Sequence, residues 1–206
     1  MSQSFWDAAY DIDGYKYGTA PNHFLRIHAD RLPNAGKILL PGDGEGRNAV
    51  WLASRGHEVT SVDNSAIGLQ KATAWARQQG VMIETIQADL AQWQPRTDHY
   101  DAVVLTYLHF AEDLRRIVHR KLLTALKVGG LLILEAFHPN QLDCQSGGPK
   151  SAQMLYRLDD IVSDFYESLD ILTAWEGEIL LEEGLGHQGP AFVTRYLGLK
   201  HARVSR

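Results

Sequence analysis

Residues 38–51, with the sequence ILLPGDGEGRNAVW, constrain the fold more than any other stretch of the chain. The apolar run Ile38–Leu40 leads into three glycines at alternate positions, and a pattern with one apolar side follows, as expected of a helix. This order predicts a β-strand, a tight turn and an α-helix, the repeating unit of doubly wound α/β sheets. Glycine suits Gly42, Gly44 and Gly46 because it accepts positive φ and lets a ligand approach the backbone closely. Such a turn presents backbone N–H groups to a nucleotide-like ligand, although it also occurs without one.

The residues between and after these glycines indicate which ligand the turn suits. A dinucleotide-binding turn reads G-x-G-x-x-G, and the position of its third glycine is Arg47 here. The turn also carries two carboxylates, Asp43 and Glu45, which would repel a pyrophosphate. S-adenosylmethionine has no phosphate and carries a sulfonium and an ammonium cation. The acidic turn therefore favours S-adenosylmethionine over NAD, and an NAD-dependent oxidoreductase remains an alternative.

The rest of the chain alternates between short apolar runs and helical patterns, which predicts one α/β sheet. We expect Gly129 and Gly130 to end a helix just before the fifth strand, and the chain to finish in a β-hairpin. The expected strands after the first are His57–Asp63, Val81–Ala88, Tyr100–Tyr107, Leu131–Phe137, Ile171–Leu181 and Ala191–Leu199, with a loop at Glu182–Pro190 in the hairpin. The expected helices after the first are 65–80, Ala111–Val128 and Tyr156–Ser168.

Composition and charge restrict the class of protein. A chain of 206 residues is expected to form one domain with a sizeable core. The net charge of −5 and the absence of a large basic block argue against nucleic acid as a partner, and the short basic end at Lys200, His201, Arg203 and Arg206 is expected to be solvated. Cys144 is the only cysteine, so no disulfide framework is expected. No apolar run approaches the length of a membrane span, and the N-terminus does not resemble a signal peptide, so we expect a cytoplasmic protein.

The first 35 residues are unusually aromatic, with Phe5, Trp6, Tyr10, Tyr15, Tyr17 and Phe24. One interpretation is a helix that packs on the domain. The other is a segment that closes over a ligand at the glycine turn. We expect Tyr10, Tyr15 and Tyr17, together with Phe110, to line the pocket of a small substrate.

The ordered set of motifs resembles the class I S-adenosylmethionine-dependent methyltransferases over nearly the whole chain. The residues that carry this resemblance are the Gly42-x-Gly44-x-Gly46 turn, Asp63, the step Ala88-Asp89-Leu90, the strand YDAVV from Tyr100, and Gly129-Gly130. The sequence GRN at 46–48 and the short length are most similar to the tellurite-resistance methyltransferases, with the thiopurine methyltransferases more distant. The resemblance implies one methyltransferase domain over residues 1–206, with a Rossmann-like seven-stranded sheet that is mostly parallel and has an antiparallel last strand.

The resemblance also implies the cofactor contacts. Gly42, Gly44 and Gly46 would line the methionine part of S-adenosylmethionine, and Tyr107 would lie beside its sulfur. Asp63, which comes 19 residues after Gly44, would bind the ribose, with Asn64 next to it. Asp89 and Leu90 would contact the adenine. The chain departs from the family by having Leu40-Pro41 where an acid is common, and Asp43 where a small residue or cysteine is common. Asp43 or Glu45 could then orient the methionine ammonium group.

Three histidines are expected near the cofactor because each follows a strand at the carboxyl edge of the sheet, where ligands bind. His109 follows the fourth strand, His138 follows the fifth, and His187 lies in the closing hairpin. A histidine can act as the general base that a weakly nucleophilic acceptor needs, so His138 and His187 are the main catalytic candidates and His109 is the third. Each histidine taken alone could be a solvated loop residue. A three-histidine metal site is an alternative that the spacing does not support, so no metal is expected.

The sequence therefore predicts methyl transfer to a small molecule. A thiol, an amine, a hydroxyl group and a metalloid oxyanion all remain open as the acceptor. A competing hypothesis is a binding or regulatory module that keeps the fold and the cofactor but no longer transfers a methyl group; the missing acid at Leu40 is its main support.

Overall fold

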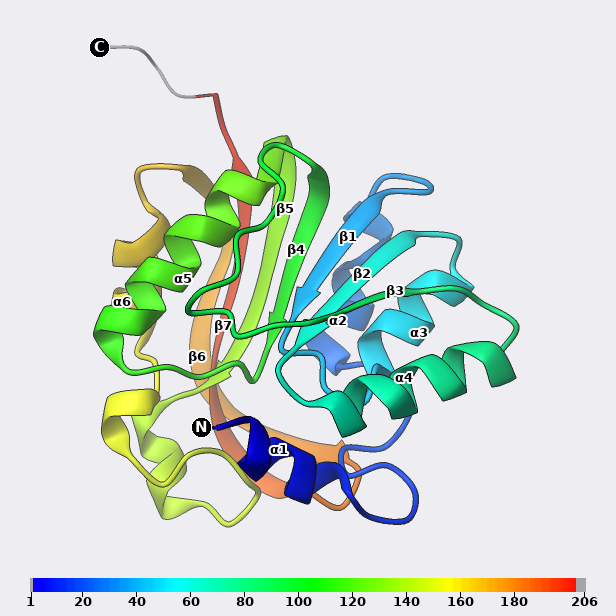
Figure 1. Ribbon diagram of the computed structural model, residues 1–206. Helices are drawn as coiled ribbons and strands as arrows, with labels where there is room; N and C mark the ends of the chain where they lie inside the picture. The colour runs from blue at the N-terminus through cyan, green and yellow to red at the C-terminus, as the bar shows by residue number, and fades with distance from the viewer. Residues whose placement is uncertain (1, 203–206) are drawn as a thin grey trace.

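Seven strands form one sheet in the order β3-β2-β1-β4-β5-β7-β6 (Figure 1). The structure is a computed structural model that describes residues 2–202, so Arg203 and Arg206 of the basic end lie outside the described residues. Strands β1 to β5 pair in parallel, whereas β7 runs antiparallel to both β5 and β6. The strands are β1 (Lys37–Pro41), β2 (Glu58–Asp63), β3 (Glu84–Gln87), β4 (Tyr100–Thr106), β5 (Leu126–Phe137), β6 (Leu169–Glu183) and β7 (His187–Lys200). The predicted fold, a mostly parallel seven-stranded sheet with an antiparallel last strand, is confirmed.

Helices cover both faces of the sheet (Figure 1). Helices α2 and α3 pack on one face with α4 beside α3, and α5 and α6 pack on the other. Helix α1 lies apart from these layers, below the sheet in the view of Figure 1, and contacts α4. The α-helices are α1 (Gln3–Tyr10), α2 (His23–His28), α3 (Arg47–Ser54), α4 (Ala66–Gln78), α5 (Glu112–Ala125) and α6 (Leu158–Phe165); the 3-10 helices are η1 (Ala29–Arg31), η2 (Pro139–Asp143) and η3 (Ala152–Met154).

The central strands are apolar throughout because both of their faces are buried. Side chains alternate between faces along a strand, so Ile38 and Leu40 of β1 pack against α2 and α3, while Leu39 packs toward α5. Phe24 and Leu25 of α2 belong to the first of these cores. The N-terminal 35 residues thus divide into two parts, since the second part is built into the core of the domain.

The expected boundary between α5 and β5 is wrong. Strand β5 begins at Leu126, where the backbone turns extended directly after the helix, and Leu126 pairs with Tyr100. Gly129 and Gly130 therefore lie within the strand instead of ending the helix. The irregular register of β4 and β5 after the first pair accommodates them. A glycine pair is ambiguous in sequence because it accompanies both helix ends and strand irregularities.

The closing hairpin is also tighter than expected. Strand β6 continues to Glu183 and β7 begins at His187, so only residues 184–186 remain in the turn. Glu183 pairs directly with His187 across the hairpin. The sequence did not indicate these strand ends because their residues are polar. Their pairing brings a carboxylate and an imidazole together at the carboxyl edge of the sheet.

Candidate functional site

A cavity of about 410 Å³ opens at the carboxyl edge of the parallel strands. Its volume is within the range of small-molecule sites. The turn after β1, the ends of β2 and β4, and the segment after β3 contribute to its wall, as does the closing hairpin. The predicted cofactor residues that line it are Gly42, Asp43, Asp63, Asn64, Asp89, Leu90 and Tyr107. The parallel topology thus brings together residues that are up to 65 positions apart (42 to 107) in the sequence.

Gly44 and Gly46 do not line the cavity. At each of these positions glycine is needed because a neighbouring residue packs closely against the turn. A Cβ on Gly44 would lie 2.3 Å from the hydroxyl oxygen of Tyr10, and a Cβ on Gly46 would lie 2.6 Å from Cβ of Ala72 in α4. Both residues also have positive φ. The glycines therefore let Tyr10 and α4 approach the turn, and only Gly42 faces the cavity.

Replacing Gly44 with alanine should lower the melting temperature more than the same change at Gly56. Both residues have positive φ, so both variants carry the backbone strain of about 1–2 kcal/mol. A Cβ added at Gly56 would meet no atom within 4 Å, whereas alanine at 44 would displace Tyr10. We expect an additional cost of roughly 1–3 kcal/mol at Gly44. Equal melting temperatures for the two variants would show that Tyr10 does not rest on the turn.

Helix α1 forms one side of the cavity through Phe5, Trp6, Ala9 and Tyr10. Asp7 fixes the helix by accepting hydrogen bonds from the Ser65 hydroxyl (2.7 Å) and the Ile67 N–H (3.2 Å), at the start of α4. Lys71 of α4 donates to the Tyr10 carbonyl oxygen at 3.0 Å. The aromatic residues before Gly18 thus lie beside the predicted cofactor residues.

The predicted substrate-pocket residues separate into two groups. Tyr10, Tyr17 and Phe110 line the cavity. Tyr15 does not, because its ring packs against Trp75 of α4 at a centroid distance of 5.2 Å, with the Lys71 ammonium 5.3 Å from its ring centroid. Sequence pattern does not distinguish a tyrosine that faces a ligand from one that packs on a neighbouring helix.

The three carboxylates around the glycine turn differ in their partners. Asp63 accepts from the N–H groups of Gly44 (2.9 Å) and Ser65 (2.8 Å). Glu45 accepts from the Lys16 N–H (2.8 Å) and pairs with Lys71 at 2.5 Å. The Asp43 carboxylate accepts from the Ala49 N–H at 3.3 Å, and its Oδ1 atom is buried without a hydrogen-bond partner in residues 2–202.

Beneath the cavity lies a buried polar network that the sequence did not reveal. Arg47 donates to Glu183 Oε2 at 2.7 Å, and Asn22 donates to Glu135 at 2.8 Å and to Glu183 at 3.2 Å. Arg195 pairs with the other oxygen of Glu135. One residue in the sequence indicates this network: Glu135 is a charged residue within the otherwise apolar strand LLILEAF. Its partners could not be found from sequence, since they lie on distant segments.

Tyr107 joins this network to the cavity. Its hydroxyl donates to Glu135 Oε1 at 2.5 Å, and its N–H donates to the Glu135 carbonyl oxygen at 2.8 Å. The residue has φ +53°, which is uncommon outside glycine and holds the ring across the end of β4. The Tyr107 ring lies against Phe137 and His187, with centroid distances of 4.6 and 4.5 Å.

His187 is the candidate histidine that the structure brings to the cavity with a free ring nitrogen. Its ring lies between those of Tyr17 (4.4 Å), Tyr107 and Phe137 (5.2 Å). Nδ1 is buried and faces Glu183 Oε2 at 3.5 Å, whereas Nε2 makes no hydrogen bond to any of the residues 2–202. Burial lowers the pKa of His187, with Arg47 acting in the same direction and Glu183 opposing them. The imidazole is therefore neutral near pH 7 and able to accept a proton.

His109 lines the cavity but both of its ring nitrogens are occupied. Nδ1 lies 2.7 Å from the Met154 carbonyl oxygen, to which it donates, and Nε2 accepts from the Phe137 N–H at 3.2 Å. Burial lowers its pKa to about 4. These bonds give His109 the role of a neutral linker between the loop after β4 and strand β5.

His138 does not line the cavity, so the three histidines do not converge on it. Nδ1 of His138 accepts from the Asn140 N–H at 3.1 Å and caps η2, while its ring packs against Phe192 at 4.6 Å. Nε2 faces Glu176 at 3.6 Å. A residue that directly follows a strand points to either side of the sheet edge, and His138 points away from the cavity. No group of three or more potential metal ligands forms within the described part of the chain.

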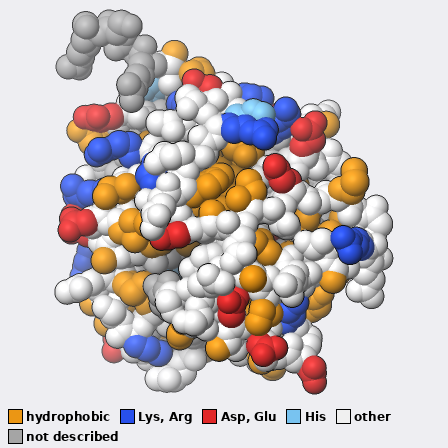
Figure 2. All heavy atoms as spheres, in the orientation of Figure 1, with side chains coloured by type: hydrophobic (Ala, Val, Ile, Leu, Met, Phe, Trp, Pro, Cys, Tyr) orange, Lys and Arg blue, Asp and Glu red, His pale blue; other side chains and the backbone are white. Residues whose placement is uncertain are grey.

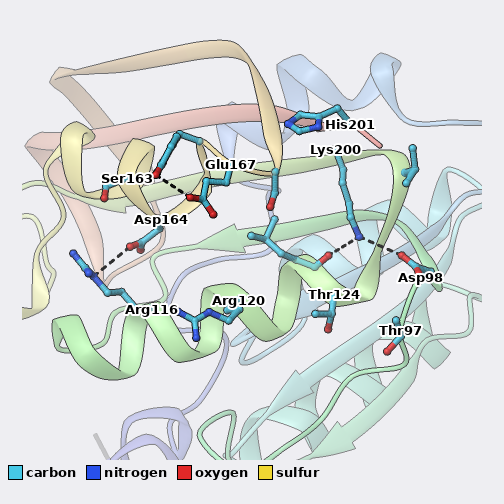
Figure 3. A pocket seen from close by; sticks show the side chains of 14 residues that line it. Thr97, Asp98, Arg116, Arg120, Thr124, Ser163, Asp164, Glu167, Lys200 and His201 are labelled. Carbon is cyan, nitrogen blue, oxygen red and sulfur yellow. Dashed lines mark hydrogen bonds and ion pairs between the residues drawn. The ribbon is translucent and has the colours of Figure 1, made fainter. Parts of the chain in front are cut away.

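A larger hollow of about 700 Å³ lies at the opposite edge of the sheet, between α5, α6 and the end of β7 (Figure 3). Most of its charged side chains already have partners. Lys200 binds Asp98 (3.2 Å) and the Leu123 carbonyl oxygen (2.8 Å), and Arg116 pairs with Glu112 (3.0 Å). It contains neither a glycine turn nor the carboxyl end of a parallel strand, so the smaller cavity is the candidate site.

Known proteins share features of this sequence and fold. Residues 38–130 match the family model described as a methyltransferase domain, while no curated protein matches the sequence. A structure described as "Conversion of a Disulfide Bond into a Thioacetal Group during Echinomycin Biosynthesis" is 18% identical, with 98% of this chain and 94% of that chain covered and a TM-score of 0.78. TehB from Haemophilus influenzae is 19% identical, with 96% and 66% covered and a TM-score of 0.71. Coclaurine N-methyltransferase bound to N-methylheliamine and SAH is 15% identical, with 85% and 71% covered and a TM-score of 0.65.

Proposed function

We propose that this chain, a class I S-adenosylmethionine-dependent methyltransferase, transfers the methyl group to a small neutral thiol, with His187 as the general base. The single observation that carries the proposal is the neutral imidazole of His187, which lines the cavity between the rings of Tyr17, Tyr107 and Phe137 and whose Nε2 makes no hydrogen bond to residues 2–202. The fold alone does not choose the acceptor. Among similar structures, one is named for conversion of a disulfide to a thioacetal and another is an N-methyltransferase.

The cavity fits the cofactor. Its acidic residues Asp43, Asp63 and Asp89 suit a ligand with two cationic centres, and no phosphate has to be accommodated. When bound, S-adenosylmethionine supplies an electrophilic methyl group on a good leaving group. The protein then has to hold the acceptor in line with that methyl group and exclude water. We infer that α1 and residues up to Gly18 cover the cofactor, because four residues of α1 line the cavity.

Charge balance beneath the cavity favours a neutral acceptor. Arg47 is bound to Glu183, and Arg195 is bound to Glu135, so two buried cations are matched by two buried carboxylates. An oxyanion would find no uncompensated arginine beneath the cavity, and an ammonium group would find no uncompensated carboxylate beneath it, since the partnerless Asp43 lies at the glycine turn instead. The other cations of the lining, Lys16 and Lys150, are accessible to solvent, where their charges are screened.

The chemistry of His187 favours a thiol among neutral acceptors. The pKa of an ordinary thiol is about 8.5, so transfer of its proton to a neutral imidazole is only moderately unfavourable. An aliphatic hydroxyl group is a much weaker acid, and a neutral amine needs no base. The rings of Tyr107 and Phe137 also provide the aromatic surface with which sulfur makes favourable contacts. In the reaction the S–H proton would pass to Nε2 of His187, and the acceptor sulfur would bond to the methyl carbon as the bond between that carbon and the cofactor's sulfur breaks, which releases S-adenosylhomocysteine.

The described surface is consistent with a small-molecule partner. Figure 2 shows acidic and basic side chains interspersed over one face, without a broad basic patch there. Within residues 2–202, no helix combines the length and the apolar character needed to cross a membrane.

A matched panel of acceptors tests the proposal. Release of S-adenosylhomocysteine should be measured with a small neutral thiol, the alcohol and the amine of the same carbon skeleton, and selenite or tellurite. We expect the thiol to give the highest kcat/KM, with a rate that falls as pH drops and His187 becomes protonated. A preference for an oxyanion or a charged amine would contradict the charge-balance argument.

A further inference from the structure

We infer that Asp43 is the counter-ion of the cofactor's ammonium group, and that cofactor binding therefore expels a proton from the protein. This inference rests on the function proposed above only for the identity of the cofactor. It goes beyond that function because it assigns the charge partner and predicts a pH dependence of binding that is separate from the pH dependence of turnover.

Asp43 is the carboxylate of the turn that still lacks a partner. Glu45 is held by Lys71 and the Lys16 N–H, and both oxygens of Asp63 accept backbone hydrogen bonds. Asp43 Oδ1 is buried with no hydrogen-bond partner in residues 2–202, and Asp43 lines the cavity next to Gly42. The two residues before the turn, Leu40 and Pro41, carry no charge, so β1 offers no alternative acid.

A buried carboxylate with an unpaired oxygen destabilises the free protein. Burial raises the pKa of Asp43 to about 7, although the Ala49 N–H, Arg47 and the Asn48 side chain lower it, and Asp63 adds to the rise. Tyr10 of α1 faces the same charges and stays protonated, since burial raises its pKa well above its usual value. Arg47 compensates for the charge of Asp43 only in part, because its guanidinium is bound to Glu183 at 2.7 Å. At neutral pH the free protein therefore contains both the protonated and the ionised form of Asp43.

The sign of the linkage follows from these charges. An ammonium group beside Asp43 favours the carboxylate, so binding lowers the pKa of Asp43 and releases a proton. Cofactor affinity should rise with pH while Asp43 of the free protein is mostly protonated and then level off above pH 7. Asp43→Asn should therefore stabilise the free protein, because it removes the unfavourable buried charge. The same substitution should weaken cofactor binding, because it removes the counter-ion.

Calorimetric titration of S-adenosylhomocysteine tests this directly, because it retains the ammonium group and needs no acceptor. For the wild type we expect the affinity to rise by about 25-fold between pH 5.5 and 7.5, the size that follows from a pKa of about 7 in the free protein and an ionised Asp43 in the complex. Titrations in two buffers with different ionisation enthalpies should show proton release. Asp43→Asn should bind at least tenfold more weakly at pH 7.5, with no pH dependence, and should melt at a higher temperature than the wild type at pH 8 without ligand.

Glu45→Gln is the matched control because Glu45 lies in the same turn and is already paired; it should keep the pH dependence of binding. Asp63→Asn tests whether the pH dependence comes from Asp63 instead of Asp43, since burial also raises the pKa of Asp63. Wild-type affinity and pH dependence in Asp43→Asn, or a pH dependence that disappears only in Asp63→Asn, would overturn the inference while leaving the methyltransferase function intact. Normal binding behaviour together with inactivity toward every thiol would instead contradict only the proposed acceptor.

Discussion

His187→Gln should lower the turnover of a thiol acceptor by about 100-fold or more, the usual contribution of a general base. Glutamine preserves a polar group of similar size between Tyr17, Tyr107 and Phe137 but cannot accept the proton effectively. The affinity for S-adenosylhomocysteine should change little, because the carboxylates that bind the cofactor are untouched. Single-turnover kinetics and calorimetry separate these two effects.

The pH profile adds a second readout for His187. Because burial lowers the pKa of the imidazole, kcat/KM of the wild type should fall only below about pH 6.5, and this acidic limb should disappear in His187→Gln. His138→Gln is the control, since His138 is also buried but does not line the cavity. Equal losses in the two variants would indicate a general loss of structure, and full activity in His187→Gln would remove His187 from the mechanism.

Glu183→Gln should lower the free energy of unfolding by roughly 3–5 kcal/mol, because it leaves Arg47 buried without its counter-charge. The Arg47 and Glu183 side chains are only 8% and 11% exposed. Burial raises the pKa of Glu183, but His187 and Arg47 outweigh it and hold the pKa at about 2. The stabilisation by Glu183 is therefore present above about pH 4.5 and is lost as pH falls toward 2. Urea unfolding of the wild type and variant over this range measures it.

The neighbouring residue provides the control for Glu183. Glu182→Gln changes an exposed carboxylate on the same strand and should leave the unfolding free energy within about 0.5 kcal/mol of wild type. A second variant that combines Glu183→Gln with Arg47→Met should recover part of the lost stability, because no unpaired buried charge remains. An unchanged stability in Glu183→Gln would show that the ion pair beneath the cavity contributes nothing to the fold.

Much of the fold could be predicted because its signals are local. The central strands are continuous apolar runs, and the predicted β2 and β4 differ from the observed strands by one residue at a single end. Of their residues at the carboxyl edge, Asp63 was indicated by its position 19 residues after Gly44, and Tyr107 by the family resemblance. The predictions failed where local chemistry is ambiguous, as at Gly129 and Gly130, which lie within β5.

The inner part of the site could not be predicted because it depends on contacts between distant segments. Asn22 and Glu135 are 113 positions apart in the sequence, and Asn22 and Glu183 are 161 positions apart. Sequence also does not tell in which direction a side chain at a strand end points. His138 and His187 are therefore equivalent candidates in the sequence, although of the two only His187 lines the cavity. The motif GRN drew attention to Arg47 by resemblance, but its role as the partner of Glu183 emerges only from the structure.

The most direct measurement is a crystal structure of the protein with S-adenosylhomocysteine and a small thiol. The account predicts the nucleoside in the cavity beside α1, its ammonium group within hydrogen-bond distance of Asp43, and the thiol sulfur facing Nε2 of His187. A nucleoside bound in the hollow between α5 and α6, or a thiol placed away from His187, would contradict it.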